Sequence, residues 1–301
     1  MVFDIVTFGS GVIDTFIDTE FNDKTNSFNY KAGSKILAHN LQNDIGGGAT
    51  NTAVAFARFG FRTGCICKIG NDNDGKNILD LLKKENIKFL GSFSSSPTGH
   101  SIILDSKSHS RTILTYKGPG NDIKLSELPV IKTKWLYYSS ILKTSLKTQL
   151  ELIKKLKKDK TKLAFNPSEY LIENVDIKDL LSQTSILILN KDEAKILTKK
   201  NNKKGDLLKS LQSLGPEIVV VTDKNNPAFA YDGKRKYSIM PNAKIKVVER
   251  TGAGDAFAAG FVAAIIAGKS IDDALKLANK ESESVIQHFG AKNKLLKMKL
   301  K

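Results

Sequence analysis

The chain has 301 residues, enough for one large α/β domain with a small appendage. Its formal net charge is +16, but only five of the 47 basic residues are arginines, and the lysines gather in polar stretches such as 154–162, 199–204 and 292–301. Base readout favours arginine and single-strand binding favours interleaved aromatic residues, so these stretches indicate solvated surfaces rather than nucleic-acid binding. No run approaches the roughly 20 apolar residues of a membrane span, and the N-terminus does not resemble a signal peptide. We therefore expect a cytoplasmic protein that binds neither nucleic acid nor membrane.

Short β-branched runs alternate with longer helical segments along the chain. Strands are predicted over 3–8, 63–69, 135–138, 162–165, 186–189, 218–221 and 245–248, and helices over 50–59, 75–85, 146–156, 192–197, 206–214 and from 252 to about 267. Some strands, such as 186–189, are apolar at every position, as a sheet covered by helices on both faces requires. The pattern predicts a doubly wound, mostly parallel sheet in a single domain spanning 1–301.

Two polar stretches interrupt this alternation. Residues 15–45 contain short alternating pieces, and residues 92–120 contain two strand-like pieces, 101–104 and 111–116, around a polar turn. We expect these stretches to form a small β lid beside the ligand end of the sheet, where it would exclude water from the reaction. The alternative is a pair of surface hairpins without a function.

The most specific signal is the stretch 251–261, which reads TGAGDAFAAGF. The backbone amides of Gly252, Ala253 and Gly254 would converge at a helix N-terminus, where the helix dipole also favours an anion. Asp255, in the first turn, would lie beside a bound phosphoryl group and accept the proton of an attacking hydroxyl. The alternative is an aspartate that caps a helix after a glycine-rich turn.

This stretch resembles the second signature of the ribokinase-like (PfkB) carbohydrate kinase family. The stretch 46–53, GGGATNTA, resembles the family's first signature, and the likeness extends from about residue 4 to residue 291. The resemblance implies a ribokinase-like fold and an acceptor site in which glycines let sugar hydroxyls approach the backbone. The residues of that acceptor site would be Asp14, Gly46, Gly47, Gly48 and Asn51.

Asn190 and Glu193 directly follow the predicted strand 186–189 and match the family's Asn-x-x-Glu. The resemblance implies that they organise a Mg²⁺ ion through its waters, which suits a carboxamide and a carboxylate at a strand end. The alternative is a helix N-cap in which Glu193 is the capping-box partner. By the same resemblance, nucleotide contacts would come from Asn190, Thr222, Gly252, Gly254 and Asn279.

Two regions depart from the family pattern. Glu249 and Arg250 replace the usual Asp-Thr pair, which puts potassium or other monovalent-cation activation in doubt. The loop 222–227, TDKNNP, lacks the two glycines that usually lie beside the nucleotide, and Lys224 would either contact phosphate or face solvent.

The resemblance implies an ATP-dependent sugar kinase that transfers the γ-phosphate to a hydroxyl of a sugar or sugar-like acceptor, with ATP and Mg²⁺ bound. Within the same chemistry, the alternative is a nucleoside (adenosine-type) kinase. From another class, the alternative is a non-catalytic sugar or nucleotide sensor on the same fold. The ligand would be a sugar, a phosphosugar or a nucleoside. Arg111 and lid lysines would hold a phosphosugar; the alternative is that Arg111 is structural or faces solvent. The protein would be a monomer or a homodimer formed through the lid.

Overall fold

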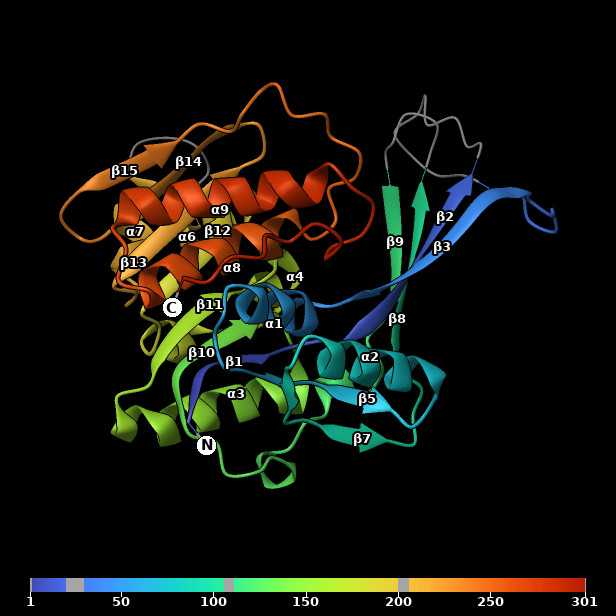
Figure 1. The fold of residues 1–301 in the computed structure, drawn as a ribbon, viewed down its shortest axis with the longest axis horizontal. Coiled ribbons are helices and arrows are strands. Elements are labelled where there is room, and N and C mark those ends of the chain that lie inside the picture. The colour runs from blue at the N-terminus through green and yellow to red at the C-terminus, as the bar shows by residue number, and fades with distance from the viewer. Residues whose placement is uncertain (1, 20–29, 106–110, 200–205, 301) are drawn as a thin grey trace.

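The computed structural model describes residues 2–19, 30–105, 111–199 and 206–300. Within these residues, nine strands form a central sheet in the order β15-β14-β13-β12-β11-β10-β1-β4-β6 (Figure 1). Neighbouring strands are parallel from β13 to β6, and β14 and β15 are antiparallel. The bounds are β1 Phe3–Phe8, β4 Thr63–Ile66, β6 Lys88–Phe89, β10 Thr133–Ser139, β11 Lys162–Asn166, β12 Ile186–Asn190, β13 Ile218–Asp223, β14 Asn226–Tyr231 and β15 Lys236–Ile239.

Helices cover both faces of this sheet, as the apolar strands predicted (Figure 1). One face packs against α1 Gly48–Arg58, α2 Asn73–Lys84, α8 Ala253–Ile266 and α9 Ile271–Ile286. The other packs against α3 Lys143–Leu156, α4 Glu169–Asn174, α5 Lys178–Leu181, α6 Lys191–Thr198 and α7 Leu207–Gln212. Short 3₁₀ turns occur at η1 Gly118–Asn121, η2 Leu125–Glu127 and η3 Lys157–Asp159.

One predicted strand, 245–248, is wrong, and another, 63–69, is divided between β4 in the central sheet and β5 Lys68–Gly70 in a separate sheet. Residues 245–248 form no strand; instead, the amides of Val248 and Glu249 donate to the carbonyl of Ile286 at the end of α9. Val247 and Val248 stay exposed, so their β-branched side chains do not mark a sheet position. The antiparallel strands β14 and β15 take the edge of the sheet, and the sequence analysis did not predict either of them.

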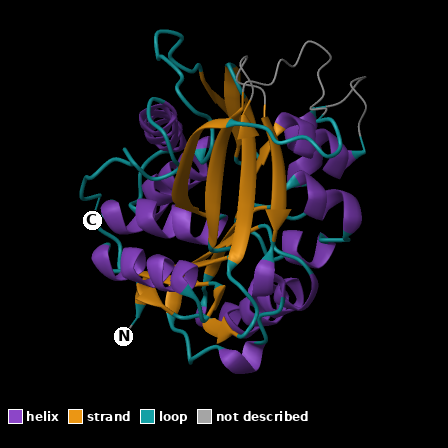
Figure 2. Cartoon of the chain, turned by 90° about the vertical axis from the view of Figure 1, so that its right-hand side faces the viewer, coloured by secondary structure: helices purple, strands orange, loops and turns teal. Residues whose placement is uncertain are grey.

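The predicted appendage forms a second sheet, in the order β3-β2-β8-β9, which projects from the edge of the molecule (Figures 1 and 2). Its strands are β2 Val12–Thr19, β3 Ala38–Gly46, β8 Gly99–Asp105 and β9 Arg111–Tyr116. Residues 92–94, which we expected in the appendage, instead form β7, which pairs with β5 Lys68–Gly70 in a separate two-stranded sheet. Arg111 opens β9, and its side chain lies outside the described part of the structure.

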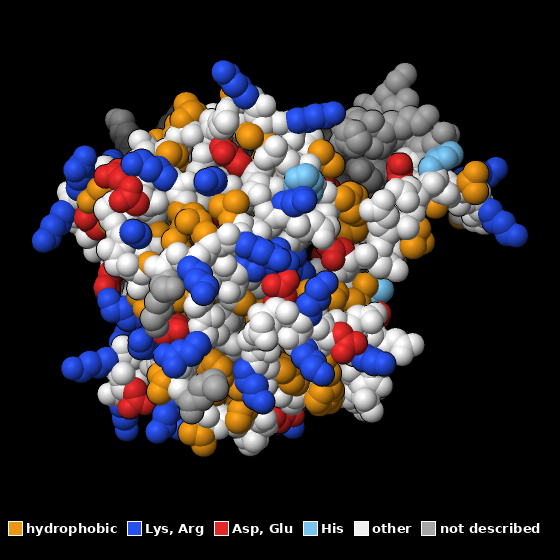
Figure 3. All heavy atoms as spheres, in the orientation of Figure 1, with side chains coloured by type: hydrophobic (Ala, Val, Ile, Leu, Met, Phe, Trp, Pro, Cys, Tyr) orange, Lys and Arg blue, Asp and Glu red, His pale blue; other side chains and the backbone are white. Residues whose placement is uncertain are grey.

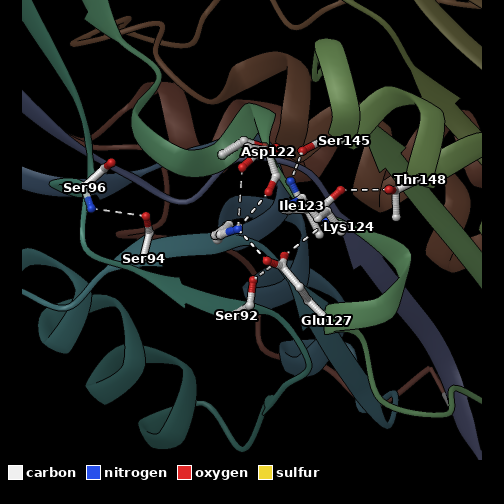
Figure 4. A network of polar contacts seen from close by, with 11 residues as sticks. Ser92, Ser94, Ser96, Asp122, Ile123, Lys124, Glu127, Ser145 and Thr148 are labelled. Carbon is white, nitrogen blue, oxygen red and sulfur yellow. Dashed lines mark hydrogen bonds and ion pairs between the residues drawn. The ribbon is translucent and has the colours of Figure 1, made fainter.

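A partly buried polar network connects the chain that leaves the second sheet to the core (Figure 4). Nζ of Lys68, in β5, donates to the carbonyl of Asp122 at 2.8 Å and to Oε1 of Glu127 at 2.7 Å. The amide of Ile123 donates to Oγ of Ser145 in α3 at 2.7 Å. The segment between β9 and β10 is therefore held from two sides at the base of the second sheet.

Most lysine side chains are exposed, in agreement with the solvated surfaces expected from the sequence. On the face drawn in Figure 3, lysine and arginine side chains are scattered, with acidic side chains between them. The lysine run 199–204 lies almost wholly outside the described residues. Cys65 and Cys67 are buried free thiols. In the described part of the chain, no helix is long and apolar enough to cross a membrane.

Candidate active site

The chain turns sharply into helix α8 at Gly252. This residue caps the helix with φ +79°, a left-handed conformation that residues with a side chain rarely adopt. A methyl group on Gly252 would also overlap the side chain of Ala291, so glycine allows the C-terminal segment to approach closely. The turn places Asp255 in the first turn of α8, as the sequence predicted.

Two of the three predicted amides are open at this helix end. In the described part of the chain, the amides of Gly252 and Gly254 have no hydrogen-bond acceptor, and a Cβ on Gly254 would meet only open space. The amide of Ala253, by contrast, donates to the carbonyl of Arg250 at 3.2 Å. The N-terminus of the 14-residue helix α8 therefore offers two unengaged donors beside Asp255.

The N-terminus of α1 meets the N-terminus of α8. Nδ2 of Asn51 donates to Oδ2 of Asp255 at 2.8 Å across a separation of 204 residues. Gly47 is the N-cap of α1, and Gly48 is its first residue. A Cβ on Gly48 would lie 3.7 Å from Oδ1 of Asp255, so this glycine lies beside the second carboxylate oxygen.

Asp14 reaches the same place from β2. Its carboxylate lies directly against Gly46, where any side chain would overlap it. The Asp14 side chain is only 8% exposed, and this burial raises its pKa to about 6. The charge of Lys292 and a hydrogen bond with Ser101 lower this pKa, whereas the charges of Asp44 and Asp255 raise it further. The structure thus brings together the five acceptor residues predicted from the sequence.

Lys292 also lies in this cluster, although the sequence analysis placed it on a solvated surface. Its side chain is 4% exposed, and Nζ donates to Oδ1 of Asn51 at 2.5 Å and to the carbonyl of Ile45. The sequence alone gives no signal that separates it from its neighbours Lys294 and Lys297, which are exposed. Only the folded chain shows that one lysine of this run points inward.

Burial also raises the pKa of Asp255. The hydrogen bond from Asn51 and the charge of Lys292 act in the opposite direction and favour the ionised carboxylate. Tyr137 of β10 is buried nearby, and both its burial and the charge of Asp255 raise the pKa of its phenol, which therefore stays protonated. Asp255 is thus a largely enclosed carboxylate whose ionised form is favoured by Asn51 and Lys292.

A second group of predicted residues lies at the ends of β12 and β13. Asn190 and Thr222 are register partners at the C-terminal ends of these parallel strands. Oδ1 of Asn190 accepts from the amide of Glu193 at 2.9 Å, and Oε2 of Glu193 accepts from the amide of Asn190 at 2.8 Å. The capping box therefore exists. Burial raises the pKa of Glu193 to about 7, and the charges of Glu169 and Asp192 raise it further.

The loop after β13 is exposed to solvent, and the last residue of β13 forms an ion pair. Lys224 has φ +49° and is exposed, and Asp223 pairs with Lys191 at 2.7 Å. Asn279 of α9 donates to Oε1 of Glu283 at 2.8 Å and to the carbonyl of Met240 at 3.4 Å. Asn279 therefore fastens the segment before α8 rather than pointing freely into a site.

Comparison with known proteins identifies the family. The family model for "pfkB family carbohydrate kinase" matches residues 4–298. The chain belongs to this family. The ribokinase of Haemophilus influenzae is 29% identical over 276 residues, covering 88% of each chain, and the cytidine kinase of Thermococcus kodakarensis is 27% identical, covering 81% of this chain and 88% of its own. The structure of ribokinase from Giardia lamblia matches with a TM-score of 0.85 at 21% identity, covering 97% of this chain and 96% of its own.

Membership of the pfkB family makes the protein an ATP-dependent phosphotransferase that acts on an alcohol group. The structural match confirms the ribokinase-like α/β fold. The family does not by itself identify the acceptor, because the relatives above include both a ribokinase and a cytidine kinase.

Proposed function

We propose that this pfkB-family protein transfers the γ-phosphate of ATP to a hydroxyl of a sugar or sugar-like acceptor, with Asp255 as the general base. The observation that carries the proposal is the Asp255 carboxylate, held by Asn51 at 2.8 Å beside the open amides of Gly252 and Gly254. Phosphoryl transfer requires little beyond a positioned hydroxyl, a proton acceptor and stabilisation of charge on the phosphoryl oxygens.

The two oxygens of Asp255 have different tasks in this proposal. Oδ2 is held by Asn51, whereas Oδ1, which lies beside Gly48, accepts the proton of the acceptor hydroxyl. Asp14 accepts hydrogen bonds from other hydroxyls of the acceptor, and Gly46 to Gly48 let the acceptor lie against the backbone. The amides at the α8 N-terminus donate to the phosphoryl oxygens as negative charge develops there.

On the nucleotide side, the proposal places ATP across the ends of β12 and β13, beside Asn190, Thr222 and Asn279. A Mg²⁺ ion bound to the phosphates would neutralise their charge. Asn190 and Glu193 would hold its waters, and the donor set fits: burial raises the pKa of Glu193 to about 7, so a cation would favour its ionised form. The mechanism proposed here includes no monovalent cation, because Glu249 and Arg250 replace the family's usual Asp-Thr pair; Oε2 of Glu249 accepts from the amide of Thr251 at 2.6 Å.

The nucleoside-kinase alternative has one observation in its favour, the 27% identity to a cytidine kinase over most of both chains. A nucleoside also offers ribose hydroxyls to Asp14 and Asp255, so the described residues that bind hydroxyls would serve either acceptor. The two candidates differ in whether a base must fit beside the sugar.

We also propose that the second sheet acts as a lid and, if the protein self-associates, as its interface. One face carries Asp14 toward the site, and the opposite face exposes apolar side chains. These include Leu41, Ile102 and Leu114. Sedimentation velocity distinguishes the two states that we consider: a dimer dispersed by Leu114→Lys supports the interface, and a dimer unaffected by that change contradicts it.

An acceptor screen tests the proposed function. ADP release is measured with Mg²⁺-ATP against sugars, phosphosugars and nucleosides, with the no-acceptor rate as the blank. We expect one of these classes to stimulate ADP release at least tenfold. If none does so in a folded protein that binds ATP, the proposal of a kinase acting on these acceptors is wrong.

A further inference from the structure

We propose that Lys292 is a positioning residue for phosphoryl transfer, because its buried ammonium group fixes the orientation of the Asn51 amide that binds Asp255 and balances the charge of three surrounding carboxylates. This inference rests on the proposed role of Asp255 as the base. It assigns a task to a residue in the C-terminal segment, outside both glycine-rich motifs.

The orientation of the Asn51 amide follows from what Lys292 can do chemically. An ammonium group only donates hydrogen bonds, and Nζ of Lys292 lies 2.5 Å from Oδ1 of Asn51. The other end of the amide, Nδ2, therefore faces Asp255 and donates to its Oδ2 at 2.8 Å. If the amide were reversed, its oxygen would face the carboxylate and its NH₂ group would face the ammonium. Lys292 thus selects the one orientation in which Asn51 supports the base.

The charges around the site also require a cation. Burial lowers the pKa of Lys292, and the charges of Asp44, Asp14 and Asp255 oppose this effect and favour its ammonium form. Oδ2 of Asp44 is buried and has no hydrogen-bond partner among the described residues. Carboxylates that share a site raise one another's pKa values unless a positive charge compensates. Further titratable groups face the cluster: Lys117, which follows β9 and interacts with Asp14, the protonated phenol of Tyr137 beside Asp255, and Arg58, whose charge lowers the pKa of Lys292.

The segment that carries Lys292 is fastened along its length, unlike a solvated tail. Nη1 of Arg58 donates to the carbonyl of Lys292 at 2.8 Å, and the Arg58 guanidinium is itself held by two hydrogen bonds to Glu85. Farther along, the buried Glu281 accepts from the amide of Leu296 at 2.9 Å. The amide of Met298 donates to the carbonyl of Arg58 at 3.2 Å. These contacts fix the backbone from which Lys292 reaches inward.

The variant Lys292→Met tests this role, because it keeps the length of the side chain and removes the charge. We expect kcat at pH 7 to fall about 10-fold to 100-fold, the range expected when a hydrogen bond to a charged group is lost. Lys299→Met removes the same charge from an exposed position of the same segment and serves as the matched control. It should keep the wild-type kcat.

The pH profile separates positioning from a purely structural role. The charge of Lys292 lowers the pKa values of Asp14 and Asp255, so its removal raises both. A carboxylate with a higher pKa becomes protonated sooner as the pH falls, so the acid limb of kcat should move to higher pH in Lys292→Met. The loss of activity should therefore shrink as the pH rises. A variant that raises only the KM for the acceptor, with kcat and its acid limb unchanged, would overturn the proposal.

A readout that does not need turnover keeps this test separate from the proposed function. Carbon-13 NMR of labelled aspartate carboxyl groups gives the pKa of Asp255 directly, with Asp255→Asn used to assign its signal. We expect a higher pKa in Lys292→Met than in the wild type or Lys299→Met, even if no acceptor is found. Where Lys292→Met does not fold, Lys292→Gln also removes the charge and retains a donor. An unchanged Asp255 pKa in either folded variant contradicts the inference.

Discussion

The acceptor side and the nucleotide side of the candidate site are built in different ways. On the acceptor side, Asn51 links Asp255 and Lys292 through contacts that span 204 and 241 residues, and all three are partly or fully enclosed. On the nucleotide side, the contact between Asn190 and Glu193 spans three residues, and Asn190 is exposed. Folding therefore organises the acceptor side, whereas the nucleotide side presents local loops that a ligand would complete.

This difference decides what a substitution should reveal. Residues of the acceptor side touch one another, so changes there should combine non-additively and affect the chemical step. On the nucleotide side, Asn190 and Glu193 contact each other locally, so changes at this pair should alter metal or nucleotide binding and leave the fold intact. Four measurements test the contrast.

The largest effect is expected from Asp255→Asn. The amide keeps the size of the carboxylate but cannot accept the hydroxyl proton as a base, so kcat should fall by roughly 10² to 10⁴. ATP affinity, measured by calorimetry, should change little because the amides of Gly252 and Gly254 are untouched. An equal loss of ATP binding would instead place Asp255 on the nucleotide side.

Gly46→Ala should have the next largest effect. Its new methyl group would overlap the Asp14 carboxylate and displace it, and a displacement of about 1 Å can cost on the order of 100-fold in rate. We expect the KM for the acceptor to rise by at least 10-fold while the KM for ATP is retained. Gly120→Ala is the control, because a Cβ there meets nothing within 4 Å. Equal kinetics in the two variants would show that Asp14 does not bind the acceptor.

The pH dependence provides a third test of the acceptor side. Burial raises the pKa of Asp14 to about 6, so Asp14 is ionised above this pH and protonated below it. Acceptor binding through an ionised Asp14 should therefore be lost as the pH falls through 6, with kcat/KM dropping roughly 10-fold between pH 7 and pH 5. In Asp14→Asn the inflection near pH 6 should vanish. A persisting inflection would assign it to another group.

The smallest effect is expected on the nucleotide side, from Glu193→Gln. Glutamine can still complete the capping box with Asn190, so the fold should be unchanged. The Mg²⁺ concentration for half-maximal activity should rise about 5-fold to 10-fold, near the lower end of losses seen when an outer-shell partner of a metal is removed. Asp192→Asn removes a neighbouring exposed carboxylate as a control. Identical Mg²⁺ titrations would leave the Asn190–Glu193 pair as a capping box alone.

Sequence reasoning succeeded where the residues that determine an element lie close together in the chain. Strands such as Ile186–Asn190 could be predicted because their apolar residues are consecutive in the sequence, and the structure buries every one of these residues. The turn at Gly252 could be predicted because its glycines and Asp255 are adjacent. It failed where the deciding contact is distant: Val247 and Val248 resemble a strand, yet their environment is set by Ile286 at the end of α9.

The same limit explains why Lys292 was missed. A lysine-rich run usually faces solvent, and the burial of one member depends on Arg58 and on the segment around Ile45, more than 200 residues away in the chain. The strand β14 was missed for a related reason, because Asn225, Asn226 and Pro227 signal a turn and conceal the strand that begins there. Among the described strands, β15 pairs only with β14.

The central claim is that Asp255 acts as the base in the transfer step itself. Single-turnover rapid quench with γ-labelled ATP, at saturating acceptor, measures that step directly in the wild type and in Asp255→Asn. The account predicts a labelled phosphate ester in the wild type and the same ester formed roughly 10² to 10⁴ times more slowly in the variant. Equal single-turnover rates in the two proteins would contradict it.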